Sequence, residues 1–397
     1  MNFKGGGPME RLYEQMRRQL AYAPQDFRRY MYDRINWDNR MLGLVGPRGV
    51  GKTTLFLQRI KNAHDLSDTL YFSADDLYFT AHTLFDTAEA FCKAGGTYLF
   101  IDEVHKYPGW SRELKLMYDV FPQLHVYFTG SSILDIEKGE ADLSRRAPRY
   151  LMQGLSFREY LAIRHGIELP ALTLEDVLAH KAETPPLMRP LPYFHDYLQS
   201  GYYPFGVDAD FPTELEQVIS RTLEVDIPLF AGMTAATGRK LKKLLAVIST
   251  LVPFKPNMSS LAKQLQVSRN VVEEYLMYLE KAGMIAQLRS GAGGLGALGK
   301  AEKVYLDNPN ILHCLGGSET DPGTVRETFL LNQARVGHDV VASPASDFCI
   351  EGITFEVGGK NKGQSQVAGI ENAFVVKDDI EYGYGNVIPL WAFGMMY

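Results

Sequence analysis

The feature that most constrains this 397-residue chain is a glycine-rich loop. The segment Gly46-Pro-Arg-Gly-Val-Gly51-Lys52-Thr53 follows an apolar run at residues 40–45 and precedes a stretch with helical spacing. Glycines let backbone N–H groups close around phosphates, and the N-terminus of the following helix adds its positive dipole end. In such a loop Lys52 contacts the β- and γ-phosphates, and the hydroxyl of Thr53 is a ligand of Mg²⁺. The predicted nucleotide-binding residues are Gly46, Pro47, Arg48, Gly49, Val50, Gly51, Lys52, Thr53 and Thr54.

A second motif, Phe100-Ile-Asp102-Glu103, ends an apolar stretch of strand type. Asp102 is predicted to hold Mg²⁺ directly or through water, because a carboxylate at a strand end serves this purpose in phosphoryl transfer. Glu103 is predicted to be the catalytic base that orients and deprotonates the attacking water. The two motifs together favour nucleotide hydrolysis, and a loop that binds nucleotide without turnover is the alternative.

Further catalytic candidates follow the strand-like segment at residues 125–129. AAA+ proteins place a polar sensor of the γ-phosphate or the water at this point, and Ser131 is the first choice here, with Thr129 as the second. Arg145 and Arg146 are predicted to neutralise charge that develops in phosphoryl transfer, in the same chain or in a neighbouring one. A surface salt bridge is the alternative for these arginines. An arginine that acts on a neighbouring chain would require an oligomer.

Strand-like and helical segments alternate over the first 154 residues. This alternation is typical of α/β proteins in which helices wrap a parallel sheet. An apolar strand between the phosphate loop and the acidic strand is the arrangement of the AAA+ branch of P-loop NTPases. The predicted fold is therefore α/β, with an AAA+ P-loop ATPase domain at residues 1–154.

The remaining chain divides by pattern into three predicted modules. Residues 155–236 are mostly helical in pattern and fit a helical lid, although several prolines interrupt them. Residues 237–300 contain three helical segments, a tight break and a closing strand, which indicate a winged helix-turn-helix. Its glycine-rich stretch at 290–299 is interpreted as a wing or a linker. Residues 301–397 mix strands and helices in an α+β unit.

Positive charge is concentrated in the predicted winged helix. Residues 239–300 carry ten Lys and Arg against three Glu, a balance of +7, while the whole chain is at −6, so that the remainder totals −13. A basic module in an acidic chain suggests that this part faces duplex DNA. The candidate contacts are Arg269 and Asn270 at the start of the third helix, with Lys242 and Lys243 beside them. Glu273 and Glu274 on the same helix would repel phosphates, so a protein-docking module is the alternative.

Three acidic residues and a lysine suggest a further site in the last unit: Glu327, Asp347, Glu356 and Lys360. Metal-dependent nucleases of the restriction-enzyme type use carboxylates on adjacent strands to hold Mg²⁺ and a lysine to position water or stabilise the phosphate. The usual ending is acidic-x-Lys, but Gly358 stands two residues after Glu356, and Lys360 comes two residues late. We therefore expect a vestigial nuclease site, and an active nuclease is the alternative.

The composition predicts a cytoplasmic protein without a membrane role. No apolar run approaches the roughly 18 residues that span a bilayer, and the first residues contain no apolar stretch of signal-peptide length. Cys92, Cys314 and Cys349 are scattered without metal-ligand spacing, so buried free thiols are expected.

Taken together, these motifs resemble a large prokaryotic family of AAA+ ATPases whose C-terminal part is an uncharacterised, restriction-nuclease-like domain. The resemblance covers nearly the whole chain and rests on residues 46–54, 98–106, 129–132, 143–146, 155–160, 197–204, 326–329 and 354–357. It implies ATP and Mg²⁺ as ligands, a helical lid, a winged helix and a nuclease-like end. It implies no particular client.

The leading hypothesis is Mg²⁺-dependent ATP binding and hydrolysis coupled to DNA binding, as a switch in defence or in another DNA transaction. The first alternative is a signalling or scaffold ATPase whose C-terminal modules bind a protein client. The second alternative is an ATP-dependent nuclease.

Overall fold

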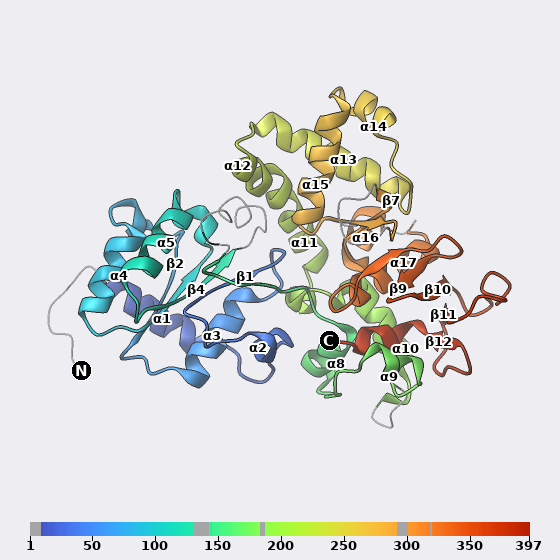
Figure 1. Cartoon of the computed structure of the whole chain (residues 1–397), viewed down its shortest axis with the longest axis horizontal. Coiled ribbons are helices and arrows are strands. Elements are labelled where there is room, and N and C mark those ends of the chain that lie inside the picture. Colours follow the sequence, from blue (N-terminus) through green and yellow to red (C-terminus); the bar gives the residue numbers. More distant parts are fainter. Residues whose placement is uncertain (1–8, 131–142, 144, 183–186, 292–300, 318–319) are drawn as a thin grey trace. The chain divides into compact units, whose positions relative to one another are not determined.

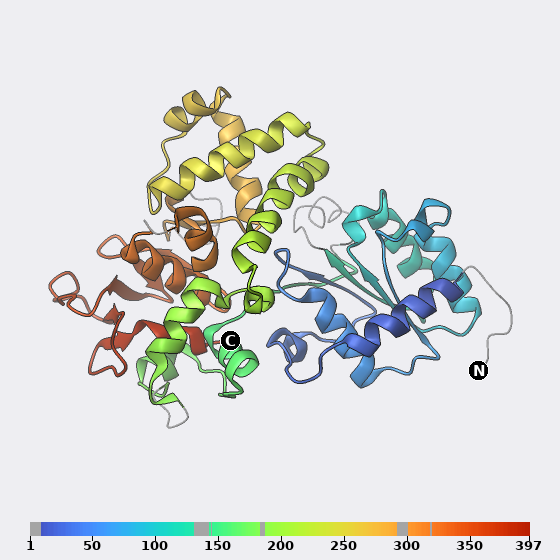
Figure 2. The ribbon, with the colours of Figure 1, turned by 180° about the vertical axis from the view of Figure 1, so that it is seen from behind.

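The computed structural model describes residues 9–130, 143, 145–182, 187–291, 301–317 and 320–397. Ser131 and most of the glycine-rich stretch at 290–299 lie outside these ranges. The chain separates into two compact units, residues 1–153 and 154–397. Figures 1 and 2 show the elements of both units from opposite sides.

The first unit is built on a sheet with the strand order β2-β3-β4-β1-β5. Its strands are β1 (Met41–Val45), β2 (Thr69–Ser73), β3 (Tyr98–Asp102), β4 (His125–Gly130) and β5 (Arg149–Leu151). All neighbouring strands pair in parallel, which requires crossover connections over the faces of the sheet. The predicted α/β class with a parallel sheet is therefore confirmed for this unit. Because β4 lies between β1 and β3, the end of β4 separates the phosphate loop from Asp102.

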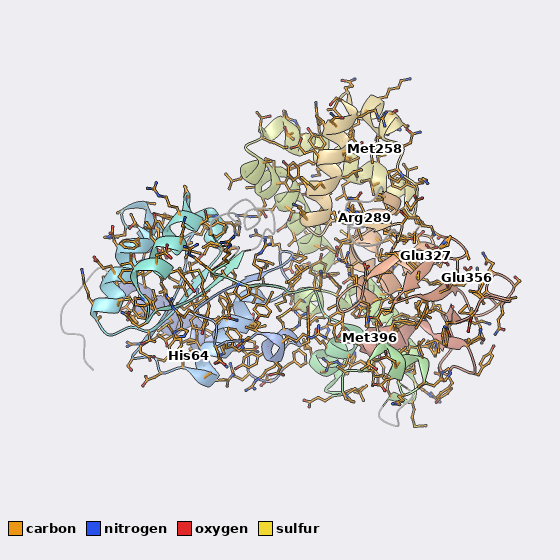
Figure 3. All side chains as sticks on the ribbon, viewed as in Figure 1. His64, Met258, Arg289, Glu327, Glu356 and Met396 are labelled. Atoms are coloured by element: carbon orange, nitrogen blue, oxygen red, sulfur yellow. The ribbon has the colours of Figure 1, made fainter. Side chains whose placement is uncertain are left out.

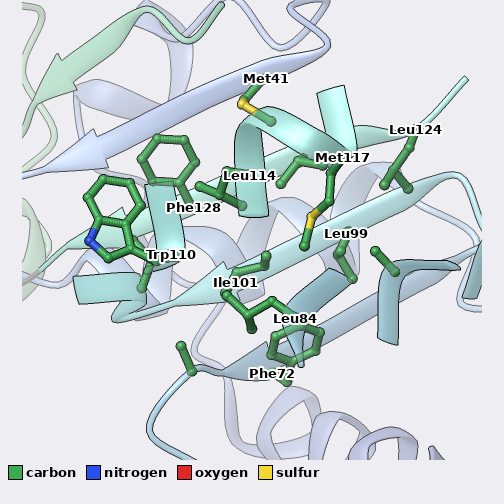
Figure 4. Close-up of a cluster of buried hydrophobic side chains, with 14 of the residues drawn as sticks. Met41, Phe72, Leu84, Leu99, Ile101, Trp110, Leu114, Met117, Leu124 and Phe128 are labelled. Carbon is green, nitrogen blue, oxygen red and sulfur yellow. The ribbon is translucent and has the colours of Figure 1, made fainter. Parts of the chain in front are cut away.

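Alternate residues of the central strands face opposite sides of this sheet, as the two-residue period of a strand requires. One face carries a core under α4 (Leu84–Lys93) and α5 (Trp110–Val120), with Leu99, Ile101, Val126 and Phe128 from the strands (Figure 4). On the other face, the ring of Phe100 lies 5.2 Å from that of Phe56 on α3 (Lys52–Ala63). Burial on both faces explains why these strands have continuous apolar sequences.

The other described elements of the first unit are α1 (Glu10–Tyr22), α2 (Met31–Arg34), η1 (Leu77–Thr80) and η2 (Val104–Lys106). Helix α1 packs along the edge strand β2, where the sulfur of Met16 accepts the backbone N–H of Tyr71 at 3.2 Å.

His64, at the end of α3, makes the stability of the first unit depend on pH (Figure 3). Its ring lies 4.3 Å from that of Tyr98, and burial, with the charges of Arg59 and His125, lowers its pKa to about 4. The unfolded chain gains a proton here near pH 6.5, whereas the folded unit does so only near pH 4. Stability should therefore fall as the pH drops through this window.

The variant His64→Phe keeps the aromatic packing and removes the titrating nitrogens. Between pH 7 and pH 5 we expect it to lose about 1 kcal/mol less stability than the wild type, a figure reduced because the ring is only half-buried. Denaturant unfolding at both pH values measures this difference. His82→Phe is the control, since that ring stacks on Tyr78 at 4.2 Å. Equal losses in the wild type and His64→Phe would contradict the assignment.

The second unit begins with helical segments: α8 (Phe157–His165), α9 (Leu174–Leu178), α10 (Pro190–Asp196), η4 (Tyr197–Gly201), η5 (Pro204–Val207), α11 (Phe211–Arg221), η6 (Thr222–Asp226) and α12 (Ile227–Ala231). These residues, which we expected to be a lid, belong to the same compact unit as the C-terminal elements. The hydroxyl of Ser156 and the guanidinium of Arg158 both donate to the main-chain oxygen of Tyr397, at 2.5 and 2.9 Å.

The middle of the second unit contains α13 (Ala235–Leu251), α14 (Met258–Leu265), α15 (Arg269–Lys281), β6 (Ile285–Arg289) and β7 (Ala301–Leu306). Strands β6 and β7 pair antiparallel. Phe254, between α13 and α14, forms an additional antiparallel bridge to Val304, whose N–H donates to its carbonyl at 2.9 Å. The side chain of Ser268 caps the start of α15.

The last part of the second unit has a mixed sheet with the order β12-β11-β10-β9-β8. The elements are α16 (Pro309–Gly316), α17 (Pro322–Ala334), β8 (Val340–Ala342), β9 (Phe348–Ile350), β10 (Ile353–Gly358), β11 (Ala373–Lys377), β12 (Val387–Pro389) and η9 (Leu390–Met395). Strands β8, β9 and β10 are antiparallel neighbours, whereas β10, β11 and β12 run parallel. The sequence ends in buried apolar residues, including Trp391 and Phe393.

Across the described parts of the chain, every helix is too short or too polar to cross a lipid bilayer.

Candidate functional site

The phosphate loop connects β1 to α3 in a conformation that its glycines make possible. Gly49 and Gly51 have φ angles of 83° and 97°, a region that residues with a side chain rarely adopt. A Cβ atom at Gly46 would lie 2.1 Å from the carbonyl oxygen of Met152. The loop therefore needs glycine at each of these positions to keep its backbone N–H groups available.

Lys52 is the first residue of α3 and is almost fully buried. Its ammonium donates to the carbonyl oxygens of Gly46 and Pro47, at 2.9 and 2.7 Å. The cation thus lies inside the loop, where phosphate oxygens could replace these carbonyls as acceptors.

Arg29 supports the loop from outside the motif, and the sequence pattern did not identify it. Its guanidinium donates to the carbonyl of Val50 at 2.5 Å and to that of Gln153 at 2.8 Å. The side chain is buried, with 6% of its surface exposed. No local pattern marks such a residue, because its partners are 21 and 124 positions away.

Asp102 ends β3 and accepts hydrogen bonds from three hydroxyl groups. Thr53 and Tyr71 donate to Oδ2 at 2.7 and 2.9 Å, and Thr129 donates to Oδ1. Burial and the nearby charge of Asp102 raise the pKa of Tyr71 well above its ordinary value, so this hydroxyl remains a donor. Thr53 and Asp102 therefore bring together a hydroxyl and a carboxylate oxygen, the ligand types that Mg²⁺ prefers.

Glu103 follows Asp102 in a left-handed backbone conformation, with φ of 51°. Its N–H donates to the hydroxyl of Thr129 at 3.0 Å, and its carboxylate forms an ion pair with Lys106. Burial alone would raise the pKa of Glu103, but the hydrogen bond and charge of Lys106, with the charges of His105 and Arg48, hold it below its ordinary value. The carboxylate is thus ionised and able to accept a proton.

Thr129, the second choice for a polar sensor, connects the two acidic residues from the neighbouring strand β4. His105 was not identified from the sequence. Burial lowers the pKa of His105 to about 4; the charge of Glu103 opposes this shift, and the charges of Lys52, Lys106 and Arg48 add to it. An uncharged imidazole therefore lies close to the loop cations at neutral pH.

The remaining catalytic candidates have different surroundings. Ser131 lies outside the described residues. Arg146 contacts Asp119 through Nε at 3.1 Å and Nη2 at 3.2 Å, which is the salt bridge that the sequence left open as an alternative. Arg145 is exposed. Their roles in catalysis stay predictions.

The acidic residues predicted in the last unit converge on two lysines. Lys303 of β7 lies 3.3 Å from both Glu327 of α17 and Asp347, which precedes β9. Glu356 of β10, labelled in Figure 3, is buried. It forms an ion pair with Lys362. Lys360, the predicted member, is exposed. The sequence missed Lys303 and Lys362 because the fold, and not the acidic-x-Lys spacing, brings them to the carboxylates.

Other polar groups fix this carboxylate cluster, defined as Glu327, Asp347 and Glu356. Tyr305 donates to Glu327 at 2.7 Å, and the N–H of Val357 donates to Asp347 at 2.9 Å. Burial and the charge of Asp347 raise the pKa of Glu327, although Tyr305 and Lys303 oppose this. A pocket beside the cluster is lined by residues that include Phe254, Lys303, Val341 and Asp347.

The predicted DNA contacts differ in how they are engaged. Arg269 and Asn270 are exposed in the first turn of α15. Lys242 lies 3.3 Å from Glu224 and Lys243 donates to the carbonyl of Gln264 at 3.0 Å. Two flanking cations are also paired: Arg289 with Glu280 at 2.6 Å and Lys255 with Glu302 at 2.6 Å. Lys242, Lys255 and Arg289, three of the ten cations of residues 239–300, are therefore neutralised by carboxylates.

Comparisons with known proteins match two parts of the chain. Residues 38–161 match the family model described as an AAA domain, and residues 191–321 match a domain of unknown function (DUF8612). The chain is 25% identical over 322 residues to the uncharacterized protein MJ1637 of Methanocaldococcus jannaschii, covering 71% of this chain and 67% of that protein.

Two solved structures are similar at low identity. The Walker-type ATPase PABY2304 of Pyrococcus abyssi has a TM-score of 0.43 and 12% identity, over 77% of this chain and 95% of that one. A RuvB variant of Thermotoga maritima has a TM-score of 0.28 and 17% identity, over 70% and 89% of the two chains.

The AAA match includes the phosphate loop, Asp102 and all strands of the parallel sheet. The other match overlaps the predicted lid and winged helix and assigns them no function. The first unit of this chain is therefore similar to an AAA domain over residues 38–161, the segment that carries the phosphate loop and Asp102.

Proposed function

We propose that the first unit binds and hydrolyses ATP with Mg²⁺. The observation that carries this proposal is the hydrogen bond of 2.7 Å between the hydroxyl of Thr53 and the carboxylate of Asp102, beside the buried ammonium of Lys52. Mg²⁺ bound by these oxygens would supply charge neutralisation for the phosphates. ATP, and not another nucleotide, is proposed from the family resemblance.

The chain's own residues have separate tasks in this reaction. Lys52 and the loop N–H groups hold the phosphates. Glu103 orients a water whose oxygen bonds to the γ-phosphorus, while the bond from that phosphorus to the ADP oxygen breaks and one water proton passes to Glu103. Thr129 supports this arrangement through its hydrogen bonds to Asp102 and Glu103.

We further propose that α13 to β7 act as a winged helix-turn-helix that binds duplex DNA and influences hydrolysis. Support comes from the order of three helices and a hairpin among the described residues, and from exposed Arg269 and Asn270 at the start of α15. A helix of this kind reads the major groove from its N-terminal residues.

Phosphate release from ATP, measured with and without duplex DNA at low salt, tests this coupling. Acceleration by DNA supports it, and unchanged hydrolysis together with no retardation of duplex DNA rejects it. Arg269→Ala should weaken DNA binding. It should also reduce the slope of log affinity against log salt concentration by about one. Lys242→Ala is the matched control, because Ser220 and Glu224 already engage this ammonium and it should change DNA affinity less.

A protein-docking role for the second unit is the alternative that the paired cations favour. Glu280 and Glu302 neutralise Arg289 and Lys255, which reduces attraction to phosphates. A protein that co-purifies with Glu103→Gln in ATP, and leaves in ADP, would support a signalling or scaffold ATPase.

An ATP-dependent nuclease is the third candidate, favoured by Lys303, which lies 3.3 Å from both Glu327 and Asp347. Lys303 and Lys362 occupy the carboxylates of the cluster, so a metal ion would have to displace them. Nicking of plasmid DNA that requires Mg²⁺ or Mn²⁺ and is lost in Glu356→Ala would support cleavage. Absence of metal-dependent nicking would leave the cluster a vestigial site.

A further inference from the structure

Lys106 joins the proposed catalytic base to a second carboxylate. Its ammonium forms an ion pair with Glu103 and lies 2.6 Å from Oδ2 of Asp75. The Lys106 side chain is 14% exposed and that of Glu103 24%, whereas that of Asp75 is 55% exposed. One largely buried cation is thus shared between the base and an acceptor at the surface.

The local backbone explains why these groups meet. Glu103 leaves β3 in a left-handed conformation, and the short η2 turn brings Lys106 back toward it, with the Lys106 N–H donating to the Glu103 carbonyl at 3.0 Å. Asp75 follows β2, the strand that pairs with β3. The pairing of β2 with β3 therefore places Asp75 beside the ammonium of Lys106, which the η2 turn positions.

The backbone of Glu103 is held independently of this lysine, because its N–H donates to Thr129. What Lys106 controls is the carboxylate itself. A base must offer a carboxylate oxygen to the attacking water, and an ammonium in contact with that carboxylate competes for the same lone pairs.

We propose that Lys106 is a positioning residue that restrains Glu103, and that Asp75 weakens this restraint by competing for the same ammonium. The proposal rests on the ATPase function proposed above. The state with Lys106 on Glu103 hydrolyses slowly, and the state with Lys106 drawn to Asp75 frees the base. Any event that changes the exposed Asp75 contact then changes the rate of hydrolysis.

The test measures kcat and KM for ATP with the full-length chain. Lys106→Met should raise kcat about fivefold, which corresponds to about 1 kcal/mol, and leave KM unchanged. Asp75→Asn, which removes the competing charge, should lower kcat about twofold. In the double variant the kcat should return to that of Lys106→Met, because Asp75 acts only through the lysine.

Two further variants separate this role from simple stabilisation. Lys106→Arg retains a cation and should stay within about twofold of the wild-type kcat. Lys93→Met, which breaks a surface pair with Glu89 at 2.9 Å, is the matched control and should leave kcat unchanged. If Lys106 only stabilised the fold, Lys106→Met and Asp75→Asn would both lower kcat or the stability. The two variants would then not change kcat in opposite directions.

The inference is overturned if Lys106→Met is no faster than the wild type while the wild type hydrolyses ATP. It is also overturned if the double variant differs from Lys106→Met. If the wild type and Lys106→Met both bind ATP and neither releases phosphate, the ATPase function fails instead. If phosphate release appears only in Lys106→Met, both the restraint and the hydrolytic site are supported.

Discussion

Replacing Lys52 by alanine should abolish ATP binding and lower phosphate release by about 100-fold or more, the range expected when a charge-stabilising group is removed from a phosphoryl-transfer site. The ammonium lies inside the phosphate loop, whereas the other buried cation at the loop, Arg29, is engaged by the carbonyls of Val50 and Gln153. Fluorescence of an ATP analogue measures binding, and a phosphate-release assay measures turnover.

Glu103→Gln should separate binding from chemistry. The amide keeps the size of the side chain but cannot accept a water proton, so we expect normal ATP binding with hydrolysis slower by about 100-fold or more. Lys61→Ala, on an exposed position of α3, is the control for both variants. Normal turnover in Glu103→Gln would show that another group is the base. Normal ATP binding by Lys52→Ala would contradict the assigned site.

The second large effect concerns Asn310, which holds the second unit together. Its amide donates to the carbonyls of Tyr197 and Leu198, at 3.1 and 2.9 Å, and its oxygen accepts the N–H of Tyr202 at 2.8 Å. The side chain is 1% exposed. Asn310→Ala removes these three buried hydrogen bonds to main-chain groups and should destabilise the second unit by about 3 kcal/mol.

Urea unfolding followed by circular dichroism measures this loss. Gln364→Ala is the control, because the hydrogen bond of 3.1 Å from its side-chain amide to Asn386 is exposed and should contribute less than about 0.5 kcal/mol. A loss below about 1 kcal/mol in Asn310→Ala would mean that water replaces the amide, and the argument from burial would be wrong.

The sites differ in how far the sequence could predict them. Gly46 to Thr53 lie in one short turn, so their local backbone geometry is enough to predict that they bind phosphate. Asp102 is distant from that turn in the sequence but not in space. It is still recognisable from the sequence, because the ends of parallel strands meet at one edge of the sheet and an apolar strand there ends in a carboxylate. Arg146 shows the limit of such reasoning, since only the position of Asp119 distinguishes a salt bridge from a group free to reach the nucleotide.

The cluster in the last unit shows the same limit more clearly. Glu327, Asp347 and Glu356 were predicted from type and order, and the fold gathers all of them around lysines. The predicted partner was Lys360, but the ion pair is made by Lys362, and Lys303 comes from β7, which pairs with β6. Spacing rules describe one strand and cannot specify a cation that arrives from another element.

By itself, the sequence determined the α/β class of the first unit, the phosphate loop and the acidic strand end, because each depends on residues that are local in the chain. Only the tertiary structure decided the partners of Lys106, Arg29 and Lys303, and the membership of residues 155–236 in the second unit. The physical reason is that residue spacing within a segment sets its backbone geometry. The partner of a charged side chain depends instead on which side chains the fold places within a few ångströms of it.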